Sequence, residues 1–217
     1  MTVLQADDLY RFFHAGDDET LALRGVSLAV DAGEMVAVTG PSGSGKSTLL
    51  NCLAGLDEPD GGIVRVAGAV VSRRPEPERA RLRARHVGLL FQAGNLLPHL
   101  TVADNLGFAR RLAGRPSGST SLLDDLGVGA RAGAYPGELS GGEAVRAGLA
   151  VALANDPAVL LADEPTGEVD SAAERRVLAL LRARAEAGAA VVLVTHSTAV
   201  ATEADRTIAL HDGQVVA

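Results

Sequence analysis

Short runs of apolar, often β-branched residues alternate along this chain with segments whose apolar positions repeat at helical spacing. Such alternation is typical of α/β folds, in which buried strands are joined by helices. Five runs predict strands, at residues 35–39, 63–66, 87–91, 159–162 and 190–195. The fold class that we expect is therefore α/β.

The N-terminal part differs, because two strand-like stretches follow each other without a helix between them. They cover residues 3–9 and 21–30 and are joined by a polar turn at residues 16–19. This arrangement predicts an antiparallel β flap ahead of the α/β core.

Two further segments depart from the alternation. From Gly94 to about residue 134 the strand signal disappears, and glycine and proline break helix-like pieces, which predicts a helical insertion. Near the C-terminus, stretches at residues 206–210 and 214–216 flank Asp212-Gly213, a dipeptide that strongly indicates a β-hairpin.

Composition narrows the class of protein. A chain of 217 residues suits one domain, and its 47% hydrophobic and 22% charged residues exclude disorder over most of its length. An aromatic share of 3% and a net charge of −7 argue against nucleic acid as a partner. Apolar runs such as residues 188–194 are too short for a transmembrane helix, and residues 1–9 do not resemble a secretory signal. We therefore expect a cytoplasmic protein, in agreement with the lone Cys52.

A glycine-rich loop follows the strand predicted at residues 35–39 and precedes a segment with helical spacing. In this context the pattern is that of a P-loop. Its glycines let backbone N–H groups turn toward phosphate oxygens, and the N-terminus of the following helix adds partial positive charge. The nucleotide-binding residues that we expect here are Gly40, Pro41, Ser42, Gly43, Ser44, Gly45, Lys46, Ser47 and Thr48.

Lys46 is the single lysine of a chain with 19 arginines. A compact ammonium group suits the β- and γ-phosphates of a nucleotide, where a planar guanidinium would fit poorly. Ser47 would offer its hydroxyl group to Mg²⁺. The alternative is a Gly/Ser turn with a chance lysine, and the strand-loop-helix context disfavours it.

An acidic pair follows the strand predicted at residues 159–162. Asp163 lies at the C-terminal edge, where ligands of parallel sheets bind, and would hold Mg²⁺ directly or through water. Glu164 would face the γ-phosphate and polarise an attacking water. Taken alone, the pair could equally be an acidic turn after a core strand, but the P-loop favours the catalytic interpretation.

Several short motifs follow the P-loop in order. They are Gln92 after a strand, Leu139-Ser140-Gly141-Gly142-Glu143 at the start of a helix, Asp170 after Pro-Thr-Gly-Glu-Val, and His196 after Val-Leu-Val-Thr. The set resembles the nucleotide-binding subunit of ATP-binding cassette transporters, over essentially the whole chain. Residues 91–98 and 164–167 most resemble the lipoprotein-releasing and macrolide-exporting ATPases of this family. A related ATPase that acts in cell division, the cell-division relative, is also similar.

The resemblance implies how the site would work. A head-to-tail dimer would sandwich ATP between the P-loop of one subunit and Ser140, Gly141 and Gly142 of the other. We expect these three residues to form an anion site without any cationic side chain. With Lys46 and Glu164, catalysis would involve His196 at the γ-phosphate. It would also involve Gln92, which would sense Mg²⁺ and the lytic water and pass movement to the helical insertion.

An aromatic residue of the flap would bind the base of the nucleotide. The resemblance places Phe13 against adenine, with Tyr10 as a substitute. Simple packing of Phe13 within a strand is the competing interpretation.

The resemblance further implies a single ABC ATPase domain with a P-loop NTPase fold. A RecA-like core with its antiparallel flap would cover about residues 1–92 and 146–217, and a helical subdomain about residues 93–145. The cofactors would be ATP and Mg²⁺, and the partners a second copy of the chain and a separate integral membrane permease. The protein would then lie at the inner face of the cell membrane.

Two other functions stay open. One is a regulatory ATP switch that recruits a membrane partner without moving a solute, as in the cell-division relative. The other is a P-loop kinase, which would have no use for residues 139–143.

Some positions depart from the pattern of the family. Relatives usually carry a glutamine just before the position of Arg146 and a second arginine near Ala150 or Val151. The helix that follows residues 139–143 of this chain lacks both. Ser197 replaces a frequent aspartate. None of these changes removes a phosphate or metal contact, but the unusual pair Glu168-Val169 could weaken dimer closure and turnover.

The densest positive patch consists of Arg73, Arg74, Arg79, Arg81, Arg83 and Arg85. Glu76 and Glu78 interrupt it, which favours a solvated face over binding to anionic lipid headgroups or to a partner. Pro75 and Pro77 predict a loop for its first part. Surface roles are expected for Asp124, Asp125, Glu138 and Glu143, which lack the paired spacing of a metal site.

Overall fold

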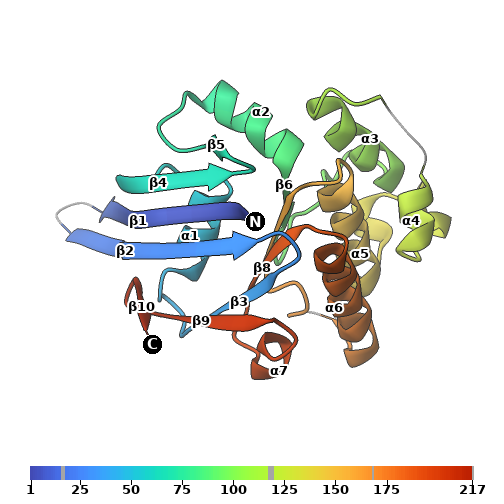
Figure 1. The fold of residues 1–217 in the computed structure, drawn as a ribbon. Helices are drawn as coiled ribbons and strands as arrows, with labels where there is room; N and C mark the ends of the chain where they lie inside the picture. The colour runs from blue at the N-terminus through green and yellow to red at the C-terminus, as the bar shows by residue number, and fades with distance from the viewer. Residues whose placement is uncertain (16–17, 117–119, 168, 217) are drawn as a thin grey trace.

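The computed structural model describes residues 1–15, 18–116, 120–167 and 169–216, and it contains two β-sheets with helices between and beside them (Figure 1). The first sheet is antiparallel, with the strand order β2-β1-β4-β5. Its strands are β1 (Thr2–Ala15), β2 (Asp18–Asp31), β4 (Gly61–Val66) and β5 (Ala69–Val70).

The antiparallel flap is therefore present, and its strands are longer than predicted. Of the turn expected at residues 16–19, Gly16 and Asp17 lie outside the described residues, and the other two residues belong to β2. The strand predicted at residues 63–66 pairs with β1, where Leu4 is opposite Val66. It thus extends the flap rather than the α/β core, because its apolar run does not reveal which sheet it joins.

The second sheet has the order β10-β9-β3-β8-β7-β6 and is parallel except for the terminal β9-β10 hairpin. This confirms the α/β class, and the hairpin lies where Asp212-Gly213 predicted it. The strands are β3 (Met35–Thr39), β6 (Val87–Leu90), β7 (Val159–Asp163), β8 (Ala190–Val194), β9 (Arg206–His211) and β10 (Gln214–Val216).

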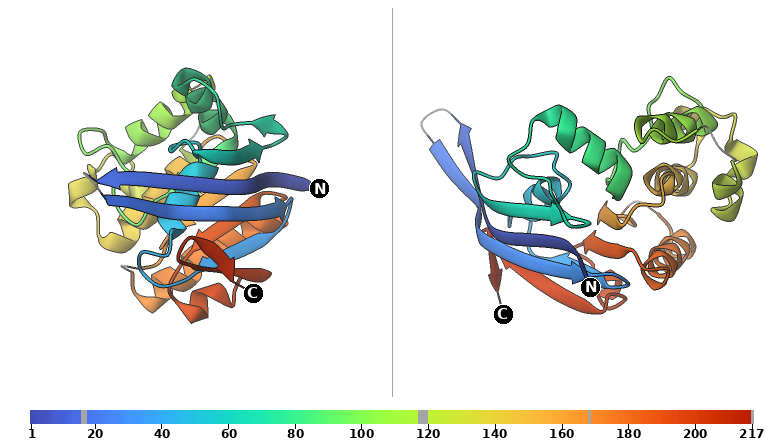
Figure 2. Two further views of the ribbon diagram at one scale, coloured as in Figure 1. Left: turned by 90° about the vertical axis from the view of Figure 1, so that its left-hand side faces the viewer. Right: turned by 45° about the horizontal axis from the view of Figure 1, so that its top comes forward.

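The core lies on both faces of the parallel sheet. Alternate residues of a strand point to opposite faces, so Leu161 joins one hydrophobic cluster while Leu160 and Ala162 join the other. The first cluster packs α1 (Lys46–Leu53) between the two sheets. The second buries α5 (Gly141–Leu153) and α6 (Ser171–Glu186). Figure 2 shows the flap and these helices on opposite sides of the parallel sheet.

The segment predicted as a helical insertion is helical in its described part. It contains α3 (Val102–Leu112), α4 (Ser121–Asp125) and the 3₁₀ turn η1 (Gly129–Arg131), and a second 3₁₀ turn, η2 (Pro136–Glu138), follows it. A short helix, α7 (Thr198–Ala201), follows β8. No helix in the described ranges combines the length and the apolar character needed to cross a membrane.

The arginine-rich segment corrects one expectation, because it forms α2 (Glu76–His86) with Pro77 inside its first turn. Proline is tolerated there, since the N–H that it lacks has no partner within a helix at that position. Residues 73–75 lie outside any helix, as predicted, and Pro75 is the N-cap of α2. Arg74 pairs with Glu78, and Arg79 and Arg83 pair with Glu76.

Candidate functional site

An open cavity of about 590 Å³ lies at the C-terminal edge of the parallel sheet. The strand ends β3, β7 and β8 deliver the P-loop, the acidic pair and His196 to this edge, as parallel strands require. The predicted residues that line the cavity are Phe13, Ser42, Gly43, Gly45, Lys46, Ser47, Thr48, Gln92, Asp163, Glu164 and His196. Gly40, Pro41 and Ser44 belong to the same loop but do not line the cavity.

Two glycines allow the loop its close path beside neighbouring strands. Gly40 has φ of 149° and Gly45 has φ of 99°, both in the region that favours glycine. A Cβ atom at Gly40 would collide with the carbonyl oxygen of Leu210, and one at Gly45 with that of Ala22. The fold itself therefore requires glycine at both positions.

Lys46 is held inside the loop that it follows. Its Nζ donates hydrogen bonds to the carbonyl oxygens of Gly40 and Pro41, each over 2.9 Å. These contacts keep the ammonium group at the mouth of the loop. A phosphate group would add a charged acceptor to a cation that is already positioned.

The two residues predicted to hold a divalent cation, Ser47 and Asp163, lie within hydrogen-bonding distance of each other. The hydroxyl group of Ser47 donates to Oδ2 of Asp163 over 3.0 Å. Burial, helped by the neighbouring charge of Glu164, raises the pKa of Asp163 above its ordinary value. No group of three His, Cys, Asp or Glu side chains that could hold a metal occurs within the described residues. Ser47 and Asp163 nevertheless fit Mg²⁺, which takes few protein ligands and completes its shell with phosphate and water oxygens.

Glu164 sits at a strained and well-anchored position. It has φ of 45°, and its N–H donates to the carbonyl oxygen of Val194 over 2.9 Å. Oε1 accepts from the backbone N–H of His196 over 3.0 Å and lies 2.6 Å from its Nδ1. Oε2 accepts from the hydroxyl group of Thr195 over 3.2 Å. The carboxylate is therefore bound to the turn that carries His196.

Phe13 lies at the rim of the cavity, and its side chain is 41% exposed. The guanidinium carbon of Arg11 lies 4.7 Å from the centre of its ring. Tyr10 does not line the cavity, and its ring packs against Gly61 and Gly25. Only one of the two aromatic candidates thus has a face near the P-loop.

Ser140 is the N-cap of α5, and its hydroxyl group accepts from the N–H of Glu143 over 3.3 Å. Glu143 accepts in return from the N–H of Ser140 over 2.8 Å and pairs with Arg131. The contacts with Arg131 and Ser140 lower the pKa of Glu143 to about 2. Glu143 thus has a defined structural role, because it forms a capping box with Ser140 at the N-terminus of α5.

A separate pocket of about 470 Å³ surrounds Ser140, Gly141 and Gly142 and shares no lining residue with the first cavity. The expectation of an anion site without cations is wrong, because Arg146 and Arg176 also line this pocket. Helix periodicity does not show which arginines from α5 and α6 will meet, so the sequence could not pair them.

Gln92 connects the first cavity to the helical segment. Besides the cavity at the P-loop, it lines a smaller one of about 230 Å³ together with Asn95, Leu96, Gly141 and Val145. A movement of the Gln92 side chain would therefore affect both the cavity at the P-loop and the cavity beside the helical segment.

Sequence reasoning missed two residues next to the predicted ones. Arg11 is two positions before Phe13 on β1, so both side chains lie on one face of the strand. Thr195 is 1% exposed, and its hydroxyl group also accepts from the N–H of Ser197 over 3.0 Å. The sequence contains a cue for each of them. Strand alternation places Arg11 on the same face as Phe13, and Thr195 ends the Val-Leu-Val-Thr motif before His196.

The described residues that depart from the family pattern lie at positions with clear structural environments. Ala150 is fully buried in α5, and Ser197 caps α7 by accepting from the N–H of Val200. Val169 lines the pocket around Ser140, whereas Glu168 lies outside the described residues.

Comparison with known proteins agrees with this geometry. A family model described as "ABC transporter" matches residues 23–167. Over 99% of its length, the chain is 46% identical to the macrolide export ATP-binding/permease protein MacB of Rhodospirillum rubrum and 43% identical to that of Shigella flexneri. It spans 34% of each, about a third of the length of these curated relatives.

Solved structures give the same result. The dimeric structure of MJ0796, a bacterial ABC transporter cassette, has a TM-score of 0.91 and 34% identity, covering 99% of this chain and 97% of that chain. A dimeric post-hydrolysis state of the same cassette, bound to ADP and Pi, has a TM-score of 0.91 and 33% identity. Family model, relatives and structures together show that this chain belongs to the ABC transporter family, as an ABC-type ATPase cassette.

Proposed function

We propose that the chain binds Mg-ATP in the cavity of the P-loop and hydrolyses it in a head-to-tail pair with a second copy. The observation that carries this proposal is the separation of two half-sites. Lys46 and Glu164 line one cavity and Ser140 lines another, with no residue in common. A second copy could supply the missing half to each, and the dimeric cassettes of MJ0796 support such pairing.

In this proposal the phosphates bind to the backbone amides of residues 40–48 and to Lys46. Ser47, Asp163 and Gln92 would hold Mg²⁺, which would neutralise phosphate charge. Asp163 must be ionised to do so, and a cation favours the ionised form of a carboxyl group whose pKa burial has raised.

Glu164 would orient the attacking water and accept its proton. For this, Oε1 must exchange its contact with Nδ1 of His196 for one with water. His196, whose side chain is 75% exposed, would turn toward the γ-phosphate. Arg146 and Arg176 of the second copy, together with the N-terminus of α5 at Ser140, would add positive potential from the other side.

Transport is the finer part of the proposal. The curated relatives are named macrolide export ATP-binding/permease proteins, and this chain spans about a third of them. We propose that the cassette drives a membrane permease at the inner face of the cell membrane. The permease would contact the helical insertion at residues 92–134, and Gln92 would couple it to the RecA-like core.

The test is phosphate release from Mg-ATP by purified protein, with Glu164→Gln as the matched inactive variant. Release by the wild type and not by the variant is expected, because Gln keeps the size of Glu but cannot accept the proton. Equal release by both would contradict the role of Glu164 as the base. Reconstitution with the permease then separates transport from a regulatory switch, since a switch would hydrolyse ATP without moving a solute.

A further inference from the structure

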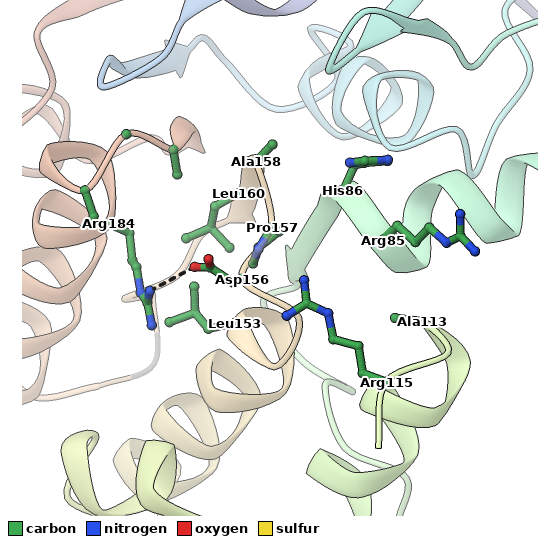
Figure 3. A pocket seen from close by; sticks show the side chains of 13 residues that line it. Arg85, His86, Ala113, Arg115, Leu153, Asp156, Pro157, Ala158, Leu160 and Arg184 are labelled. Carbon is green, nitrogen blue, oxygen red and sulfur yellow. Dashed lines mark hydrogen bonds and ion pairs between the residues drawn. The ribbon is translucent and has the colours of Figure 1, made fainter. Parts of the chain in front are cut away.

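A second large cavity lies at the opposite, N-terminal edge of the parallel sheet. Its volume is about 500 Å³, and it is formed where β6, β7 and β8 begin (Figure 3). None of its lining residues lines the P-loop cavity. A ligand here would therefore occupy a site distinct from that of the nucleotide.

The charge around this cavity is strongly positive. Arg85, Arg115 and Arg184 line it, against the single carboxylate of Asp156. This excess stands out in a chain whose net charge is −7. His86 also lines the wall, and its ring offers a further hydrogen-bond donor.

Two of the three guanidinium groups are not neutralised by the protein. Within the ranges that the structure describes, the side chains of Arg85 and Arg115 have neither an ion pair nor a hydrogen bond. By contrast, Arg79 and Arg83 of the same helix α2 both pair with Glu76. The guanidinium groups of Arg85 and Arg115 are therefore available to an anion at this cavity.

Arg115 is the residue that structural roles explain least. Arg85 and Arg184 lie in the last turns of α2 and α6, where a cation complements the helix dipole. Arg115 lies beyond Ala113, the C-cap of α3, so its side chain has no such role. Figure 3 shows it extending from this segment toward Pro157.

Asp156 marks the position where an anion would be accepted. Its carboxylate lies 3.4 Å from Nη1 of Arg184, a long and exposed contact, since the Asp156 side chain is 82% exposed. Figure 3 shows this pair at the wall opposite Arg85, whose guanidinium group points away from it. The floor between them is apolar and includes Leu153, Pro157 and Leu160.

We propose that this cavity binds a phosphate-bearing anion, held chiefly by Arg115 and Arg184, with His86 and Arg85 at its rim. Guanidinium groups donate paired hydrogen bonds that match phosphate geometry, and the anion would displace Asp156 from Arg184. The phosphate could belong to a soluble molecule or to a lipid headgroup. Binding at this cavity does not depend on the proposed ATPase function.

The test is a titration of inorganic pyrophosphate followed by calorimetry, in a Lys46→Ala background that weakens anion binding at the P-loop. We expect saturable binding that Arg115→Gln weakens about tenfold, the usual cost of a lost charged hydrogen bond. Asp156→Asn should strengthen it severalfold, because it removes the competing carboxylate. Asparagine tolerates the φ of 49° found at Asp156, so the backbone should be kept.

Arg81→Gln is the matched control, because Arg81 is an exposed arginine of α2 that does not line this cavity. Sedimentation with phosphatidylcholine vesicles, with and without phosphatidylglycerol, distinguishes the source of the phosphate. Binding to vesicles alone with the same pattern of variants assigns the site to a headgroup, and binding of pyrophosphate assigns it to a soluble anion. Absence of binding to both probes, or equal binding by all variants, would overturn the proposal.

Discussion

Oε1 of Glu164 lies 2.6 Å from Nδ1 of His196 and accepts a second hydrogen bond from the backbone N–H of the same histidine. The proposed base and the proposed γ-phosphate contact are thus joined directly to each other. Glu164 is largely buried while the His196 ring is largely exposed, so the ring is the partner that can move. Activation of the site then requires the two side chains to separate.

Glu164→Gln should stop phosphate release while leaving ATP bound. Removal of a general base lowers turnover by about a hundredfold or more, and the variant should accumulate as an ATP-bound dimer. Light scattering with Mg-ATP measures the dimer directly, with the Lys46→Ala variant as the control that lacks nucleotide. A Glu164→Gln protein that stays monomeric would rule out the sandwich arrangement.

Thr195→Val should lower kcat about tenfold with little change in KM for ATP. The buried hydroxyl group donates to Oε2 of Glu164 and accepts from the N–H of Ser197, and valine removes both contacts at similar size.

Thr195→Ser is the matched control for this positioning role, since it keeps the hydroxyl group. Steady-state kinetics of the three proteins decide the matter. If the valine and serine variants lose activity equally, the hydroxyl group is not what positions Glu164.

Asp163→Asn should stabilise the nucleotide-free protein while abolishing Mg²⁺-dependent hydrolysis. Burial raises the pKa of Asp163 in the folded state, so the folded protein binds the proton more tightly, and ionisation costs stability as pH rises. The gain from Asn should be about 2 °C in Tm at neutral pH, because the side chain is only half buried.

This prediction also sets how the stability difference between the two proteins changes with pH. The difference in Tm between wild type and Asp163→Asn should shrink as pH falls below the pKa of the carboxyl group, where both proteins carry an uncharged side chain. Thermal melts across pH measure it. A variant that is less stable than the wild type at neutral pH would show that the Ser47 contact outweighs desolvation.

Phe13→Ala should weaken ATP binding about tenfold if the ring stacks on adenine, a typical effect of losing one stacking partner. Phe108→Ala is a fair control, because Phe108 is 38% exposed on α3 and does not line the cavity. Titration of a fluorescent ATP analogue compares them. If both variants bind the ATP analogue with equal affinity, Phe13 does not stack on adenine and only packs within the fold.

Much of the fold was predictable because its strands are buried on both faces. Continuous apolar runs identified β3 and β7 nearly to the residue, and Asp212-Gly213 identified the hairpin. By contrast, α2 has no buried residue and therefore no apolar periodicity to reveal it. Ion pairs between its own glutamates and arginines help to hold it instead.

The site was predictable where a motif is contiguous and unpredictable where distant segments meet. The P-loop and the acidic pair line one cavity as the motifs implied. Helix packing decides that Arg146 and Arg176 line the pocket of Ser140, and that Arg115 and Arg184 line the same cavity. One-dimensional spacing carries no information about those meetings.

The central claim is that the loop at residues 40–48 binds the phosphates of a nucleotide through its amides and Lys46. Calorimetric titration of Mg-ATP into the folded protein tests it most directly, with Lys46→Ala in parallel. We predict saturable heat at one site per chain and its loss in the variant, whose melting curve should stay close to that of the wild type. Folded wild-type protein that gives no heat, or a variant that binds as tightly, would contradict the claim.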